Sequence, residues 1–136
     1  MNIQFVSDLH LEIPRNAQYF QKEKIIPFAD ILILAGDTMC WDEGYLQDPF
    51  WDEISSTFAQ VLVIPGNHEF YKGYDLASLR KSASGIIRDN IHWYYNQSVV
   101  IDGVQIILST LWSQIPSDIS ERIRNCCNDF TCIQYG

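Results

Sequence analysis

Three apolar segments that each stop at polar, ligand-type residues constrain the fold of this chain more than any other feature. They read QFV before SDLH, LILA before GDT, and LVI before PGNHE. Asp8 and Asp37 lie 29 residues apart, and Asp37 and Asn67 lie 30 apart. This is the length of one β-α-β unit, whose right-handed crossover lays successive strands parallel. We therefore expect three parallel strands with their polar ends at one edge of a sheet.

The hydrophobic pattern predicts an α/β chain whose first 90 residues run β-α-β-α-β-α and are followed by a β meander. The first three strands are expected at 2–6, 30–35 and 60–64, and the helices at 17–25, 50–58 and 75–90. The meander strands are expected at 91–96, 98–102 and 104–110, with a last helix at 117–125. The Asp-Gly pair at 102–103 is a strong tight-turn signal.

The polar strand ends predict a metal site. Ligands of open α/β sheets bind at the carboxyl edge of the strands, so Asp8, His10, Asp37, Asn67 and His68 are expected to converge there. Clustered carboxylates repel one another unless a cation neutralises them, and this mixture of oxygen and nitrogen donors suits Mn, Fe or Zn. Asp37 could bridge two ions, and two ions about 3.5–4 Å apart can promote an in-line displacement at phosphorus.

Each motif alone has an ordinary structural interpretation. A lone Asp-x-His after a strand is usually a solvated loop, and a lone Gly-Asp or Asn-His is usually a turn or a cap. Their conjunction after three buried strands favours the metal site. Glu69 is expected to support the site or form a salt bridge. Asp129 could reach the site, although a surface loop is favoured for it. Packing is favoured for Trp112, although a role near the site stays open.

Composition excludes several classes of protein. With 136 residues, 47% of them hydrophobic, the chain is expected to form one domain with a substantial core. Its net charge of -8 disfavours binding to nucleic acid duplexes. No apolar run approaches the ~20 residues of a membrane span, and the N-terminus does not resemble a signal peptide. We therefore expect a cytoplasmic protein with reduced cysteines; a zinc site that includes Cys126, Cys127 and Cys132 is the less favoured alternative.

The motifs DLH, GDT and GNHE, in this order and spacing, resemble those of the calcineurin-like metallophosphoesterases. That family carries D-x-H, then G-D, then G-N-H-[DE]. The segment VVIDGVQIILSTLW also resembles the strand-turn-strand-TLW segment of small bacterial members. The resemblance covers residues 1–136 and implies a β-sandwich flanked by helices, with a phosphohydrolase site that holds two divalent ions (Mn, Fe or Zn) in a complete enzyme.

The resemblance also implies a role for each matching residue. Asp8 and His10 would ligate the first ion, Asp37 would bridge both ions, and Asn67 would ligate the second through its amide oxygen. His68 would not bind metal and would protonate or polarise the leaving oxygen of the substrate.

The chain departs from the family pattern in its histidines. The family completes its site with later histidines, including a G-H-x-H pair, but this chain has three histidines and none follows His92. His92 is expected at the opposite end of the sheet. We therefore expect residues 1–136 to be the N-terminal portion of a phosphoesterase domain, with one ion or weakly bound ions and with very low or no turnover. Unpaired strand edges are expected to favour oligomers.

These observations predict a metal-dependent phosphoesterase that acts on phosphate mono- or diesters. Its partner would be a small phosphate ester or a phosphoprotein, and nucleic acid would enter only as a nucleotide or phosphodiester substrate. The alternative is a non-catalytic remnant that binds a metal or a phosphate compound, or that serves as an interaction module. The continuation of the reading frame past Gly136 would discriminate the two.

Overall fold

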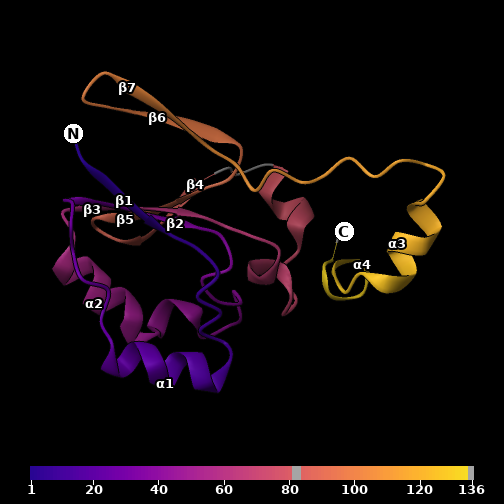
Figure 1. The fold of residues 1–136 in the computed structure, drawn as a ribbon, viewed down its shortest axis with the longest axis horizontal. Helices are drawn as coiled ribbons and strands as arrows, with labels where there is room; N and C mark the ends of the chain where they lie inside the picture. Colours follow the sequence, from indigo (N-terminus) through magenta and orange to yellow (C-terminus); the bar gives the residue numbers. More distant parts are fainter. Residues whose placement is uncertain (81–83, 135–136) are drawn as a thin grey trace.

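A computed structural model describes residues 1–80 and 84–134, which form a mixed α/β fold in three layers. A five-stranded sheet is the middle layer (Figure 1). Helices α1 (Pro14–Lys22) and α2 (Pro49–Thr57) cover one face, and a two-stranded hairpin lies over the other. The α/β class predicted from the sequence is confirmed.

The sheet has the strand order β1-β2-β3-β5-β4. Its first three strands are parallel to one another: β1 (Ile3–Val6), β2 (Ile31–Ala35) and β3 (Gln60–Ile64). Because they run in the same direction, the loops that leave them emerge at one edge of the sheet. The predicted convergence of the three polar segments therefore follows from the topology.

The core lies between these strands and α2. Leu32 and Val61 are fully buried, as is Trp51 on the helix. Pro49 begins the helix, where its missing N–H costs no hydrogen bond, and the Asp48 side chain accepts from the Phe50 amide as the N-cap. The loops at the carboxyl edge are thus held on a rigid base.

The helix predicted at 75–90 is wrong over most of its length. A short 3-10 helix, η3 (Leu76–Arg80), occupies its start, and β4 (Ser84–Arg88) occupies its second half; residues 81–83 lie outside the described part. β4 pairs antiparallel with β5 (Ile91–Tyr94) and buries Ile87. Sheet pairing and burial of a β-branched side chain outweigh the helical periodicity that suggested the helix.

The predicted meander is also corrected. β5 joins the main sheet parallel to β3, and only β6 (Gln97–Ile101) and β7 (Val104–Leu108) form a hairpin. Asp102 and Gly103, with φ of 51° and 78°, make the expected tight turn between them. The last predicted helix is found as α3 (Ser120–Cys126), whereas α4 (Asp129–Cys132) was not anticipated.

The remaining short elements are the 3-10 helices η1 (Tyr45–Gln47) and η2 (His68–Phe70). Several large apolar side chains on the strands are exposed, including Phe5 at 74% and Ile107 at 77%. The oligomer expected from open strand edges stays a prediction. Among the described residues, no helix combines the length and apolar character that a bilayer crossing demands.

Gly85→Ala should destabilise the edge of the sheet. A Cβ at Gly85 would lie 2.6 Å from Cε2 of the buried Trp93 indole, so β4 would have to move away from β5. We expect a loss of about 1–3 kcal/mol in the free energy of unfolding, measured by urea denaturation. Gly44→Ala is the control, since the nearest atom to its Cβ would be 3.6 Å away. Equal stability of the two variants would contradict the packing of β4 on Trp93.

Candidate metal centre

Backbone pairing continues past the ends of β1 and β2 and aligns their loops. The amide of Asp8 donates to the Gly36 carbonyl at 3.0 Å, and the amide of His10 donates to the Asp37 carbonyl at 2.9 Å. These bonds fix Asp8 and His10 beside Asp37, although they are far apart in sequence.

Three residues of this edge adopt the left-handed backbone region. The φ angles are 58° at Asp8, 48° at His10 and 53° at Asp37. Non-glycine residues seldom adopt this conformation, and each such residue costs on the order of 1–3 kcal/mol. Such strain concentrates at functional sites, where surrounding contacts hold it in place.

Gly36 and Gly66 have different reasons to be glycine. Gly36 has a φ of 93°, in the left-handed region that favours glycine. Gly66 is not among the described residues with positive φ; instead, a Cβ there would lie 2.7 Å from the Asp37 amide nitrogen. The second glycine is therefore required for space, because the loops after β2 and β3 pass in close contact.

Glu69 connects the loop that follows β2 with the loop that follows β3. Its buried carboxylate accepts from the amides of Asp37 at 3.0 Å, Thr38 at 2.8 Å and Gly66 at 2.7 Å. Burial raises the pKa of Glu69 to about 7, against the opposing effect of the amides. The supporting role expected from the sequence is confirmed by these bonds.

Asp8, His10 and Asp37 form a cluster of potential metal ligands. One ligand atom from each lies within 4.8 Å of the others. His10 Nε2 is 4.0 Å from Asp8 Oδ1 and 3.9 Å from Asp37 Oδ2, too far for hydrogen bonds. Two carboxylates and one imidazole nitrogen thus face a common space, as in binding sites for divalent cations.

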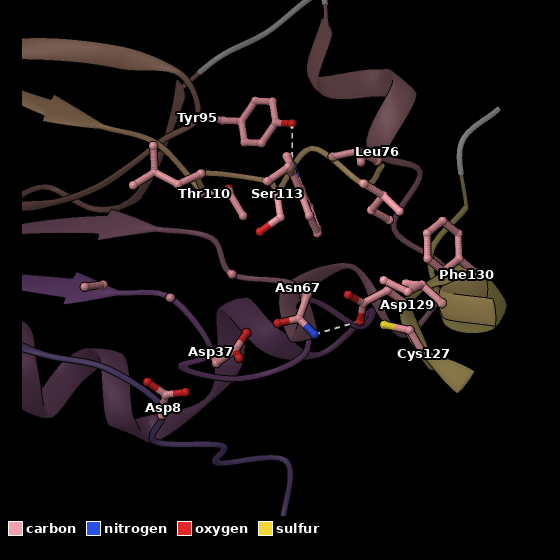
Figure 2. Close-up of a pocket in the computed structure, with 17 residues that line it drawn as sticks. Asp8, Asp37, Asn67, Leu76, Tyr95, Thr110, Ser113, Cys127, Asp129 and Phe130 are labelled. Carbon is pink, nitrogen blue, oxygen red and sulfur yellow. Dashed lines mark hydrogen bonds between the residues drawn. The ribbon is translucent and has the colours of Figure 1, made fainter. Parts of the chain in front are cut away.

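Asn67 lies on the other side of Asp37, and its amide orientation is fixed. Asn67 Nδ2 donates to Asp129 Oδ1 at 2.8 Å and to the Tyr71 hydroxyl at 3.0 Å. Its oxygen points toward Asp37 (Figure 2), so the oxygen is available as a ligand atom. The surface-loop interpretation of Asp129 is wrong, because α4 brings this carboxylate onto Asn67.

The Tyr71 hydroxyl also donates to Asp129, which closes a triangle of three side chains. Burial, together with this hydrogen bond, raises the pKa of Tyr71. The backbone amide of Leu76 donates to the Gln134 carbonyl, and Ile133 is buried. These contacts hold the segment around α4 against the site.

His68 stands beside the cluster. Its amide donates to Asp37 Oδ1 at 3.0 Å, and its ring stacks on Tyr71 with centroids 4.2 Å apart. Its Nδ1 is 2.8 Å from Oε1 of Glu12. Glu12 is an acidic residue that the sequence motifs did not indicate. In the sequence, the feature that could have pointed to Glu12 is its position two residues after His10.

A cavity of about 810 Å³ opens over the cluster (Figure 2). Asp8, Asp37 and Asn67 line one end, and the walls are largely apolar and aromatic, including Tyr95 and Trp112. No Lys, Arg or His belongs to the lining that the structure describes. Trp112 therefore does reach the region of the site, where its indole also donates to the Tyr95 hydroxyl.

The remaining candidates lie elsewhere. β5 pairs His92 with Leu62, the middle residue of β3, so His92 lies at mid-sheet and not at the opposite end, where it was expected, and it belongs to neither ligand cluster of the described residues. The four cysteines are free, and in the described part of the chain none belongs to a group of potential metal ligands. The less favoured zinc site with Cys126, Cys127 and Cys132 therefore gains no support.

The chain also matches a known protein family. The family profile described as calcineurin-like phosphoesterase matches residues 1–119. The chain belongs to the calcineurin-like phosphoesterase family. This family consists of phosphoester hydrolases that typically depend on two metal ions.

Individual relatives are distant. An uncharacterised protein of Acanthamoeba polyphaga mimivirus is 26% identical over 97% of this chain and 51% of its own length, so the chain spans about half of that relative. A crystal structure of a protein of unknown function from Aquifex aeolicus is 18% identical, with a TM-score of 0.42 over 96% of this chain and 74% of the other.

Asp129→Ala should weaken the side of the site formed by Asn67. It removes the acceptor shared by Asn67 Nδ2 and the Tyr71 hydroxyl, so the Tyr71 hydroxyl loses its acceptor and Asn67 Nδ2 keeps only its bond to Tyr71. We expect a loss of about 1–3 kcal/mol in the free energy of unfolding, measured by urea denaturation. Asp118→Ala, at an exposed position, is the control. A stability equal to that of the control would show that α4 does not hold Asn67 in solution.

Proposed function

We propose that this site hydrolyses phosphate mono- or diesters with the help of divalent ions such as Mn, Fe or Zn. The observation that carries the proposal is the cluster of Asp8, His10 and Asp37, with ligand atoms within 4.8 Å of one another at the carboxyl edge of parallel strands. Family membership supports the same reaction class.

The donor set fits divalent ions. Asp8, His10 and Asp37 would hold the first ion, and Asp37 with Asn67 would hold the second. When bound, such ions activate water and neutralise charge on a phosphate ester. The cavity also favours bound cations, because its described lining contains three carboxylates and no cationic side chain. Without bound cations it would repel a phosphate.

His68 is the proposed general acid. Its Nδ1 faces Glu12, so its Nε2 is the atom that would donate to the leaving oxygen, in the imidazolium form that carries hydrogen on both nitrogens. The amide hydrogen bond to Asp37 holds this residue next to the proposed ions without making it a ligand. The substrate would be a small phosphate ester or a phosphoprotein, and nucleotides and phosphodiesters belong to the same chemistry.

Added Mn²⁺ or Zn²⁺ should stabilise the chain. Binding neutralises clustered carboxylates only in the folded state, and it contributes about 2.7 kcal/mol at a metal concentration 100 times the Kd. Asp37→Asn should abolish most of the rise in thermal midpoint, because it removes the central carboxylate. Asp118→Asn should retain it. A melting curve that does not respond to millimolar metal would count against the site.

His68→Ala tests catalysis separately from metal binding. General acid help is typically worth about 10²–10⁴-fold, so the variant should lose that factor in hydrolysis of an aryl phosphate while binding Mn²⁺ as tightly as the parent. His92→Ala is the matched control, because His92 pairs with Leu62 in the middle of the sheet and does not belong to the cluster. Turnover is measured on the 136-residue chain and on any longer parent chain that contains it.

Full activity of the His68→Ala variant would show that His68 takes no part in the reaction. Absence of metal-dependent turnover in both chains would reject the enzyme and favour a remnant that only binds metal or phosphate.

A further inference from the structure

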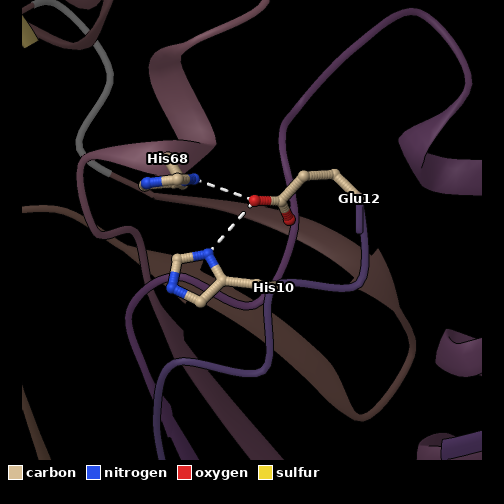
Figure 3. A group of neighbouring side chains, drawn as sticks. All are labelled: His10, Glu12 and His68. Carbon is tan, nitrogen blue, oxygen red and sulfur yellow. Dashed lines mark hydrogen bonds and ion pairs between the residues drawn. The ribbon is translucent and has the colours of Figure 1, made fainter. Parts of the chain in front are cut away.

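Glu12 lies between the two histidines of the site and is not one of the expected ligands. Its Oε1 is 3.1 Å from His10 Nδ1 and 2.8 Å from His68 Nδ1 (Figure 3). Its side chain is 12% exposed, and its Oε2 is buried without a hydrogen-bond partner among the described residues. One oxygen of a nearly buried carboxylate thus contacts both imidazole rings.

The position of the hydrogens follows from this contact. An ionised carboxylate can only accept hydrogen bonds, so each Nδ1 that bonds to it must carry the hydrogen. Burial alone would raise the pKa of Glu12, but backbone and histidine hydrogen bonds together hold it below its usual value. In a neutral imidazole with hydrogen on Nδ1, the free lone pair is on Nε2.

These lone pairs are directed away from Glu12. In both rings, Nε2 points away from the carboxylate (Figure 3). His10 Nε2 faces Asp8 and Asp37 at 4.0 and 3.9 Å, so that neither carboxylate is within hydrogen-bond distance of a hydrogen on Nε2. The free lone pair of His10 is therefore aimed at the proposed ion position.

We propose that Glu12 is the positioning residue of this site, which holds His10 and His68 together with hydrogen on Nδ1, so that both rings present Nε2 to the reacting centre. The rings are only 4.3 Å apart between centroids and nearly perpendicular, at 75°. A single carboxylate thus orients a metal-ligand histidine and the general acid at once. The orientation is a property of the metal-free chain, whereas its catalytic consequence rests on the function proposed above.

A different role for the same three side chains is a cation site of their own. Their ligand atoms also lie within 4.8 Å of one another. However, distances of 2.8 and 3.1 Å from nitrogen to oxygen are those of hydrogen bonds. A cation held by these atoms would require both Nδ1 to lose their hydrogens, so the two roles make opposite demands on Nδ1.

Long-range proton–nitrogen NMR of the ¹⁵N-labelled, metal-free chain at mildly alkaline pH locates these hydrogens directly. The three histidines are assigned with His10→Ala, His68→Ala and His92→Ala, and His92 serves as the internal reference. We expect hydrogen on Nδ1 and a free Nε2 in both His10 and His68. In Glu12→Leu, both should lose this preference while His92 keeps its spectrum. Hydrogen on Nε2 of His10 or His68 in the unsubstituted chain would overturn the proposal, even if Glu12→Leu did not fold.

Metal titration tests the consequence. Loss of a carboxylate that orients a ligating histidine typically weakens metal binding about 10- to 100-fold, so Glu12→Leu should raise the Kd for Zn²⁺ by that factor in calorimetry. Glu121→Leu, at an exposed position on α3, should leave the Kd unchanged. An unchanged Kd in Glu12→Leu would contradict the positioning role.

Zinc added to the parent chain should leave the Nδ1 hydrogens in place; their loss would show a cation at Glu12 and overturn the proposal. If the parent chain binds no metal at all, the proposed function fails, and the NMR result still decides whether Glu12 orients the rings.

Discussion

The buried carboxylate of Glu69 is the interaction on which the site depends. It accepts from three amides, on Asp37 and Thr38 after β2 and on Gly66 after β3. In the reverse direction, the His68 amide donates to the Asp37 carboxylate. Buried charges are costly unless fully hydrogen-bonded, so this arrangement is favourable only when both loops are in place. The two loops are thereby fixed as one unit, and the loop after β1 aligns with them through backbone bonds.

This rigid unit explains why strain and like charge can persist at the same edge. Asp8, His10 and Asp37 all have positive φ, and Asp8 and Asp37 bring their carboxylates to a common space. Neither feature is favourable by itself. Both are understandable if the fold arranges ligands in advance for a cation, whose binding then offsets the repulsion. Glu12 adds the orientation of the two imidazoles to this arrangement.

The sequence predicted the parts of the fold that depend on period and burial. Strands β1, β2 and β3 and the convergence of Asp8, His10 and Asp37 follow from buried segments about 30 residues apart. β4 was missed because an edge strand is decided by its partner, here β5, and its local pattern can also be read as helical. Contacts across long separations, such as Glu12 with His68 and Asn67 with Asp129, leave no periodic signal. They became visible only when the loops and α4 were placed in space.

Asp8, His10 and Asp37 are proposed to form a cation site. Anomalous diffraction at the zinc edge from crystals soaked in Zn²⁺ tests it most directly, because it locates the ion without assuming its ligands. We expect a peak within about 2.0–2.2 Å of His10 Nε2 and of a carboxylate oxygen from both Asp8 and Asp37. Peaks confined to other places, such as the cysteines of α3 and α4, or no peak at these three residues in millimolar zinc, would contradict it.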